Sequence, residues 1–369
     1  MYHMIVSIPY SLIATMDTTT QLFLLRLLMV FFSCGVIILA FKIGQVLYPE
    51  DQLPFVATTC LCFYSQFVHI GSIVSYDVLV NLFASLFLYY LLKANCSGNG
   101  WHHVLKSGFF LGMALFTKAS ALMLLPGVIF WWMLNGMKTK AWREITLKAA
   151  ILSLTAFCIG GWWYAKNLWL YQQFVFSEFG ETPSWHYSGE MNEGFGLITI
   201  ETLGWLKQVS IIQNYWQALW NSFYGLTGSF GWGNVPLKPW MYICSGMVFG
   251  SAIIGAGVTL TRIVRTPLQE YINKYSTHVL FYGVCICYCA LLFLERGKFV
   301  MGRYYFPIII PAVYLFIVSI RNVFTANQRH VFLMCFTILF IIFDTLILLE
   351  IIIPRYYLIP PPSRLLDYF

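Results

Sequence analysis

GFFLGMALFTKASALMLLPGVIFW, residues 108–131, carries one charged side chain, Lys118, inside an otherwise apolar run. The run extends over 107–135, which is longer than the roughly 20 residues that a helix needs to cross a bilayer. It predicts either one long helix with a buried lysine or a hairpin that turns at residues 117–120. The choice between them fixes the side of the membrane that every later loop faces.

The composition of the whole chain excludes a soluble domain. Of the 369 residues, 59% are hydrophobic and only 10% are charged, whereas soluble domains carry about a quarter charged residues. So few charges do not cover a water-facing surface, and the chain therefore belongs in a bilayer. The net charge of +7 is for the same reason no indication of a nucleic-acid partner, and we expect none.

Apolar stretches of spanning length recur from end to end. We predict an all-α, polytopic membrane protein with about ten transmembrane helices in a single membrane domain over residues 1–369. In residues 1–20, polar residues and a proline interrupt the apolar sequence too often for a membrane-spanning helix. The predicted spans are 22–45, 54–74, 77–94, 107–118, 119–135, 146–165, 239–261, 278–294, 304–320 and 331–353.

The distribution of basic residues favours the hairpin. Cytoplasmic loops of membrane proteins collect Lys and Arg, and one long helix would place the basic segments 93–106 and 136–148 on opposite sides. With a hairpin, the loops at 95–106, 136–146, 262–276 and 321–330 are cytoplasmic, and Lys118 lies at an outer bend. The basic residues that then share one side are Lys42, Lys93, Lys106, Lys138, Lys140, Arg143, Lys148, Arg262, Arg265, Lys274, Arg321 and Arg329.

The longest segment between the predicted spans, 172–238, then faces outward. Within it, residues 197–223 have helical character and predict a helix that lies along the membrane interface. The glycines in YGLTGSFGWGNVP, residues 224–236, predict tight turns between that helix and the next span. The segment is large enough to form a lid, and we assign acceptor binding to it, through Trp185, His186 and Glu193. Anchoring of its tryptophans at the membrane interface is an equal alternative.

Charged residues gather near the outer ends of separate spans. A charge at the middle of a membrane helix costs about 2.5–3.5 kcal/mol, so several cations and an acid from different spans predict a shared polar cavity. Such a cavity can bind the phosphate of a lipid-phosphate carrier, and a carboxylate in it can act as a general base. For Lys166, which follows Trp162 and Trp163, snorkelling at the headgroup level is an equal alternative.

The chain contains, in order, DQLPFVATTCLCFYSQFVHIGSIVSYDVLVNLFASLFLYYLL, GFFLGMALFTKASALMLLPGVIFW, GGWWYAKNLWLY, NSFYGLTGSFGWGNVPL and GRYYFPIIIPAV. In this order and spacing they resemble the multispanning GT-C glycosyltransferases, most closely the bacterial branch related to protein O-mannosyltransferases and lipid A aminoarabinose transferases. The resemblance runs over roughly residues 5–357. Each segment alone is weak evidence, and none is specific for a substrate.

The resemblance implies a bacterial inner-membrane enzyme that transfers a sugar from a polyprenyl-phosphate donor on the outer face, by inverting displacement at the anomeric carbon. The acceptor would be a glycan, a lipid or a protein. Asp77 matches the family's acid in SxD and is the catalytic candidate. The residues that the resemblance assigns to the donor phosphate are Lys118, Lys166, Arg303, Arg26 and Tyr304.

One feature departs from the family pattern. The family's catalytic carboxylate follows its first span, and HMIVSIPYSLIA, residues 3–14, resembles the end of that outer loop. We therefore expect a preceding span and part of the loop to lie upstream, and Asp17 comes too late to replace the carboxylate. Three other classes stay open: a transporter or flippase-like protein, a noncatalytic lipid-phosphate-binding protein, and a glycan polymerase or ligase of another fold. Transporters often show internal repeats, and none is visible here.

Three cysteines, Cys285, Cys287 and Cys289, have a spacing that suggests a metal site. At 100° per residue they do not share one face of a helix, whereas zinc needs ligands that converge on one point. We interpret them as small apolar side chains in a span and expect neither a metal nor a cofactor.

Overall fold

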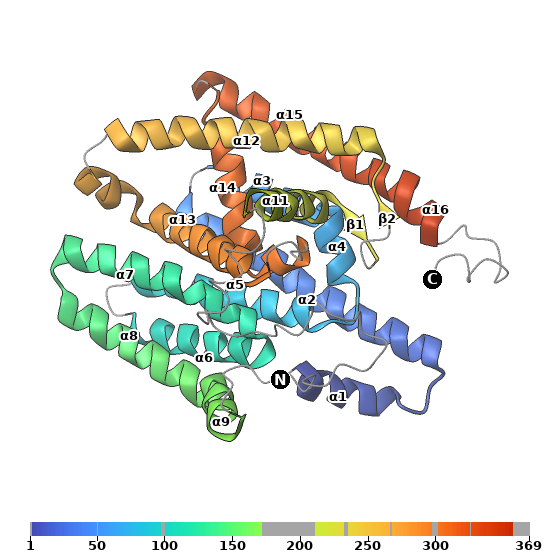
Figure 1. Cartoon of the computed structure of the whole chain (residues 1–369), viewed down its shortest axis with the longest axis horizontal. Helices are drawn as coiled ribbons and strands as arrows, with labels where there is room; N and C mark the ends of the chain where they lie inside the picture. The colour runs from blue at the N-terminus through green and yellow to red at the C-terminus, as the bar shows by residue number, and fades with distance from the viewer. Residues whose placement is uncertain are drawn as a thin grey trace.

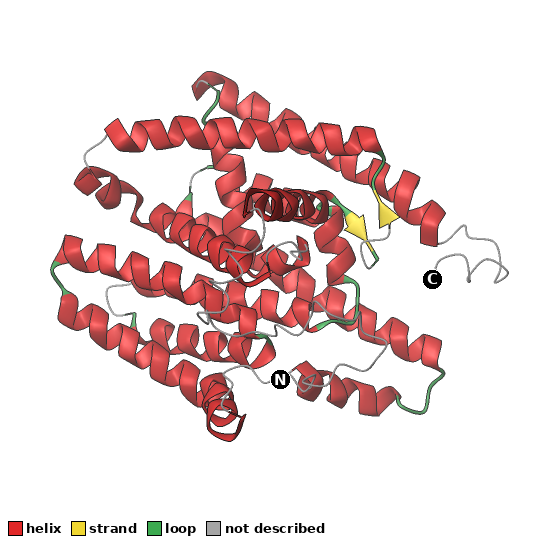
Figure 2. Cartoon of the chain, in the orientation of Figure 1, coloured by secondary structure: helices red, strands yellow, loops and turns green. Residues whose placement is uncertain are grey.

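The computed structural model of the chain describes residues 2–49, 51–96, 100–171, 211–231, 235–265, 268–296, 302–324 and 326–356. Nearly all of this part is helical, with one short antiparallel strand pair (Figure 2). The protein is therefore all-α, as the sequence predicts. Within these described ranges, seven helices are long and apolar enough to cross a membrane, and the number is eight if the bent pair α3 and α4 counts as one span. The chain is a multi-pass membrane protein.

The N-terminal half of the chain forms the helices α1 to α9, drawn from blue to green in Figure 1. Its elements are α1 (Tyr2–Ile13), α2 (Thr18–Leu47), α3 (Leu53–Cys62), α4 (Ser65–Gly71), α5 (Tyr76–Cys96), α6 (Trp101–Thr117), the 3-10 helix η1 (Ala119–Leu124), α7 (Leu125–Thr139), α8 (Trp142–Ala156), the π-helix η2 (Phe157–Gly161) and α9 (Trp162–Tyr171).

The C-terminal half packs against these helices. Its elements are α11 (Ile211–Thr227), β1 (Ser229–Phe230), β2 (Val235–Pro236), α12 (Pro239–Arg265), α13 (Leu268–Arg296), the 3-10 helix η4 (Gly302–Ile308), α14 (Ile309–Arg321), α15 (Ala326–Ile347), the π-helix η5 (Leu348–Ile352) and α16 (Ile353–Tyr356).

The chain turns at Lys118. α6 ends at Thr117, and Lys118 has the extended backbone angles φ −156° and ψ 134° before η1 begins. On the two sides of this residue, α6 and α7 run in opposite directions (Figure 1). A single helix over 107–135 is therefore wrong, and the hairpin describes the chain.

One predicted span, 54–74, is broken in the structure, and two others, 107–118 and 278–294, lie where they are predicted but in short apolar helices. The segment 54–74 is two helices that meet at 61°, α6 has only 17 residues, and the apolar part of α13 covers only Val279–Phe293. Hydropathy marks the apolar segments correctly, but it does not register where the backbone bends. α1 is a helix of 12 residues, too short to cross about 30 Å of hydrocarbon at 1.5 Å per residue.

Asp17 begins α2. Its carboxylate accepts the backbone N–H of Thr20 at 2.9 Å and the Thr20 hydroxyl at 2.7 Å, which satisfies one of the free donors at a helix start. The side-chain and backbone hydrogen bonds from Thr20 lower the pKa of Asp17. This residue therefore has a structural role as a helix cap.

Glycines let α6 approach its neighbours closely. A Cβ atom on Gly108 would lie 2.7 Å from the Leu152 carbonyl oxygen of α8, and one on Gly112 would lie 2.8 Å from the Ala156 carbonyl oxygen. Two glycines four residues apart share one helix face, and such pairs are typical of contacts between membrane helices. This packing fixes α6, and with it the position of the turn at Lys118.

The segment after α11 is held by α4. The Gln66 side chain donates to the Ser229 carbonyl at 3.1 Å and accepts the Ser229 N–H at 3.2 Å, and the Tyr64 hydroxyl donates to the Leu226 carbonyl. Gly231 has φ 63°, a conformation that favours glycine. The expected turns are thus present at this end of the segment. The predicted interfacial helix is described only from Ile211 onward, as α11.

Candidate functional site

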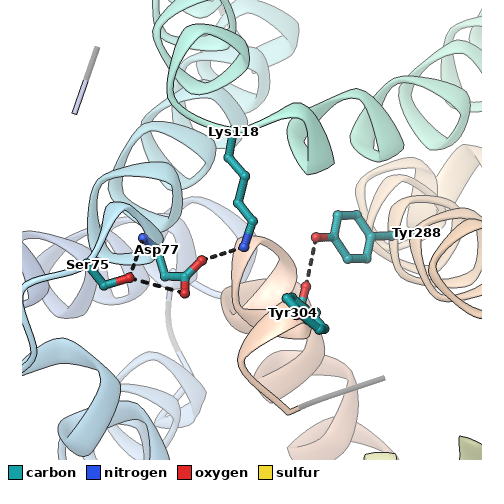
Figure 3. Close-up of polar contacts among 5 residues, drawn as sticks. All are labelled: Ser75, Asp77, Lys118, Tyr288 and Tyr304. Atoms are coloured by element: carbon teal, nitrogen blue, oxygen red, sulfur yellow. Dashed lines mark hydrogen bonds and ion pairs between the residues drawn. The ribbon is translucent and has the colours of Figure 1, made fainter. Parts of the chain in front are cut away.

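A buried ion pair lies at the turn between α6 and η1 (Figure 3). Lys118 Nζ donates to Asp77 Oδ1 at 2.5 Å. Asp77 is in the first turn of α5, and its other oxygen, Oδ2, accepts the Ser75 hydroxyl at 3.3 Å. The two charged side chains are 13% and 3% exposed, so each depends on the other to offset the loss of water.

Aromatic rings surround the ammonium group. Lys118 Nζ lies 5.0 Å from the ring centroid of Tyr76 and 5.0 Å from that of Tyr304. A cation within about 6 Å of an aromatic face is attracted by the ring quadrupole. Tyr304 is in η4, and its backbone carbonyl accepts the Tyr288 hydroxyl of α13 at 2.8 Å. Elements far apart in the sequence therefore meet at one lysine.

Arg303 adds a second cation to this cluster. Its guanidinium carbon lies 5.5 Å from the Tyr304 ring centroid, the same ring that lies 5.0 Å from Lys118 Nζ. Two cations therefore lie against one tyrosine ring, and one of them, Lys118, also pairs with Asp77. The excess of positive charge in a partly dry place favours an anionic ligand.

Two buried polar atoms flank the ion pair along the chain. The amide oxygen of Asn81, one helical turn after Asp77, and the hydroxyl of Ser120, two residues after Lys118, have no hydrogen-bond partner in the part of the chain that the structure describes. Both residues are at most 5% exposed. A buried polar group without a partner costs about 1–3 kcal/mol, and a bound ligand or water is one way to satisfy it.

The structure brings together Asp77, Lys118, Arg303 and Tyr304, four of the residues assigned from the sequence. Lys166 and Arg26 are exposed, and neither contacts this cluster among the described residues. Lys166 Nζ instead lies 5.1 Å from the Trp163 ring centroid of its own helix. That contact fits the snorkelling alternative. Trp185, His186 and Glu193 lie outside the described residues.

Sequence reasoning missed Ser75, Tyr76 and Tyr288 at this site, together with Asn81 and Ser120. Tyr76 precedes Asp77 in the SYD motif, and that adjacency was an available signal. Tyr288 has no local signal, because it reaches the site from α13 only through tertiary packing. Within the described ranges, no group of three or more His, Cys, Asp or Glu side chains is arranged to hold a metal.

The chain matches no family model, no curated protein and no solved structure at a significant level.

Proposed function

We propose that the protein is a GT-C-like glycosyltransferase of a bacterial inner membrane, which moves a sugar from a polyprenyl-phosphate donor to a glycan, lipid or protein on the outer face. The observation that carries the proposal is the meeting of separate helices at Lys118, which pairs with Asp77 and shares the Tyr304 ring with Arg303. This place is the start of α5 and the turn after α6, which we expect at the outer leaflet.

The two cations supply the contacts that a phosphate needs. Charge-assisted hydrogen bonds to phosphate are about twice as strong as neutral ones, and an arginine can bind two oxygens while a lysine acts as a point charge. In the proposed complex, Lys118 and Arg303 bind the donor phosphate, and the prenyl chain lies among the apolar helices. Both cations also stabilise the phosphate as it leaves.

The reaction is a displacement at the anomeric carbon. The acceptor hydroxyl or amine attacks that carbon, the bond between the carbon and the phosphate oxygen breaks, and the bond electrons leave with polyprenyl phosphate. Asp77 takes the acceptor's proton. For this step Lys118 turns from the carboxylate toward the phosphate, which frees Asp77 Oδ1.

The same geometry favours one second candidate, a noncatalytic lipid-phosphate-binding protein. Both oxygens of Asp77 accept hydrogen bonds, from Lys118 and from Ser75, and the residue is 2% exposed. A carboxylate with both oxygens engaged in this way is well placed to hold a lysine in position. In this candidate, Asp77 only orients Lys118.

A turnover experiment separates the two candidates. The full chain is reconstituted in vesicles with a sugar-labelled polyprenyl-phosphate donor and a bacterial envelope extract as the acceptor source, and the release of polyprenyl phosphate is measured. We expect release by the unmodified protein, a loss of about tenfold or more in Lys118→Met, and full activity in Lys238→Met. Lys238 is a matched control because its side chain is 48% exposed and pairs with Glu350. Donor binding without release would contradict the transferase and favour the binding protein.

A further inference from the structure

A second polar site lies where the α2–α3 turn meets the α14–α15 turn. The two turns border an open, shallow pocket of about 710 Å³, a volume within the range of about 300–1,000 Å³ that is typical of small-molecule sites. Its lining residues include two arginines and a histidine together with one carboxylate, and they are Tyr48, Pro49, Asp51, Gln52, Arg321, Arg329, His330 and Leu333.

This pocket is remote from the Lys118 cluster. η4 and α14 run without a break from Gly302 to Arg321, so Tyr304 and Arg321 are near opposite ends of one helical segment. At about 1.5 Å per residue, their separation of about 17 positions corresponds to about 25 Å. The basic loop 321–330 is one that we expect on the cytoplasmic side, where acidic lipid headgroups gather.

Among the described lining residues, the one carboxylate, that of Asp51, is already engaged on both oxygens. Asp51 Oδ2 accepts a hydrogen bond from Arg321 Nη1, and Asp51 Oδ1 accepts the backbone N–H of Leu53 at 3.3 Å. Asp51 therefore holds Arg321 in place without offering it further acceptors.

Both arginines keep donors that this pairing does not use. Arg321 Nε is buried and has no hydrogen-bond partner within the described ranges. Arg329 Nε donates to the Phe324 carbonyl at 3.3 Å, and a guanidinium has five N–H donors in all. His330 is exposed beside them. A buried donor without an acceptor is costly, and an anion in the pocket would satisfy it.

We propose that this pocket binds the anionic phosphate group of a second ligand, independently of the proposed transfer reaction. Arg321 and Arg329 bind the phosphate oxygens in the forked geometry that guanidinium groups favour. Asp51 positions Arg321, and His330 adds a donor at the rim. Either an acidic phospholipid headgroup or free inorganic phosphate carries the required chemistry.

Two titrations of the purified full chain distinguish these sources. In one, inorganic phosphate is added to the protein in a nonionic detergent. In the other, phosphatidic acid is added in mixed micelles of that detergent and phosphatidylcholine. The readout is the dissociation constant from the ligand-dependent rise in Tm. The variants are Arg329→Gln, Arg329→Lys and the control Arg143→Gln, which removes an exposed arginine at the start of α8, on the same expected side.

We expect saturable binding of at least one probe. Arg329→Gln should raise the dissociation constant about tenfold, the equivalent of one charge-assisted hydrogen bond, while Arg143→Gln leaves it within about twofold. Arg329→Lys keeps the charge and should recover part of the affinity. Binding of phosphate alone identifies a free-anion site, and binding of phosphatidic acid alone identifies a lipid site. No saturable binding of either probe, or equal weakening by Arg329→Gln and Arg143→Gln, would overturn the proposal.

Discussion

Lys118 and Asp77 are 41 positions apart in the sequence, and their charged groups are 2.5 Å apart in the structure. Removing one member of a buried ion pair leaves the other uncompensated, at a cost of about 3–5 kcal/mol. We expect Asp77→Asn to lower the unfolding free energy on this scale, and the double variant with Lys118→Met to recover much of the loss. Thermal unfolding in detergent measures both.

The control for this pair is Lys148→Met. Lys148 pairs with Glu144 one helical turn away, and the Glu144 side chain is 52% exposed, so the loss should be about 0.5 kcal/mol or less. Equal losses in Asp77→Asn and Lys148→Met would show that the buried pair does not stabilise the turn.

The side-chain amide of Gln66 bonds to both the N–H and the carbonyl of Ser229, as the backbone of a neighbouring strand would. We expect Gln66→Ala to speed amide hydrogen exchange at residues 228–231 and to leave exchange in α5 unchanged. The matched variant is Gln21→Ala, whose amide donates to the Ala14 and Met16 carbonyls. Gln21→Ala should speed amide exchange only in the turn between α1 and α2. Unchanged exchange at Ser229 in Gln66→Ala would refute this role.

Gly127 lies where α7 crosses α13. A Cβ atom there would be 2.4 Å from Val284 Cα and 2.5 Å from Val284 N, so the two backbones would have to separate. Gly127→Ala should therefore destabilise the protein by about 1–3 kcal/mol, as overpacking does. Gly257→Ala is the control, because a Cβ atom at Gly257 meets nothing within 4 Å, and it should be neutral or slightly stabilising. The midpoint of thermal unfolding is measured for each variant, and equal midpoints in Gly127→Ala and Gly257→Ala would contradict the prediction.

The charge distribution predicts that Thr15 is outside and Arg143 inside. In a background without reactive thiols, Thr15→Cys should react with a membrane-impermeant maleimide in sealed cells, and Arg143→Cys should react only after the cells are opened. Both side chains are exposed, so access to the reagent depends on the membrane alone. Labelling of Arg143→Cys in sealed cells would reverse the topology.

The sequence predicted the helical segments well because hydropathy is a local property. It also predicted the turn at Lys118, since charge bias distinguishes a hairpin from one long helix. It did not predict the bend between Cys62 and Ser65, because a tertiary contact, from the Tyr64 hydroxyl to Leu226, accompanies that bend. The close approach at Gly127 was invisible for the same reason.

The candidate site was predicted in part. Asp77, Lys118 and Arg303 have the same expected membrane depth, so the predicted topology indicates that they lie near one another. Lys166 has the same expected depth, but its contact with Trp163 is on its own helix, and depth does not specify which way a helix faces. Asn81 and Ser120 resemble ordinary polar residues of helices, and only their buried, unpartnered oxygens distinguish them.

The most direct test of the proposed function is the binding of polyprenyl phosphate, compared with the matching polyprenol that lacks the phosphate. The account predicts saturable binding of the phosphate by the purified full chain, much weaker binding of the alcohol, and a dissociation constant about tenfold higher in Lys118→Met than in Lys238→Met. Equal binding of the phosphate and the alcohol, or equal affinities of the two variants, would contradict a phosphate site at Lys118.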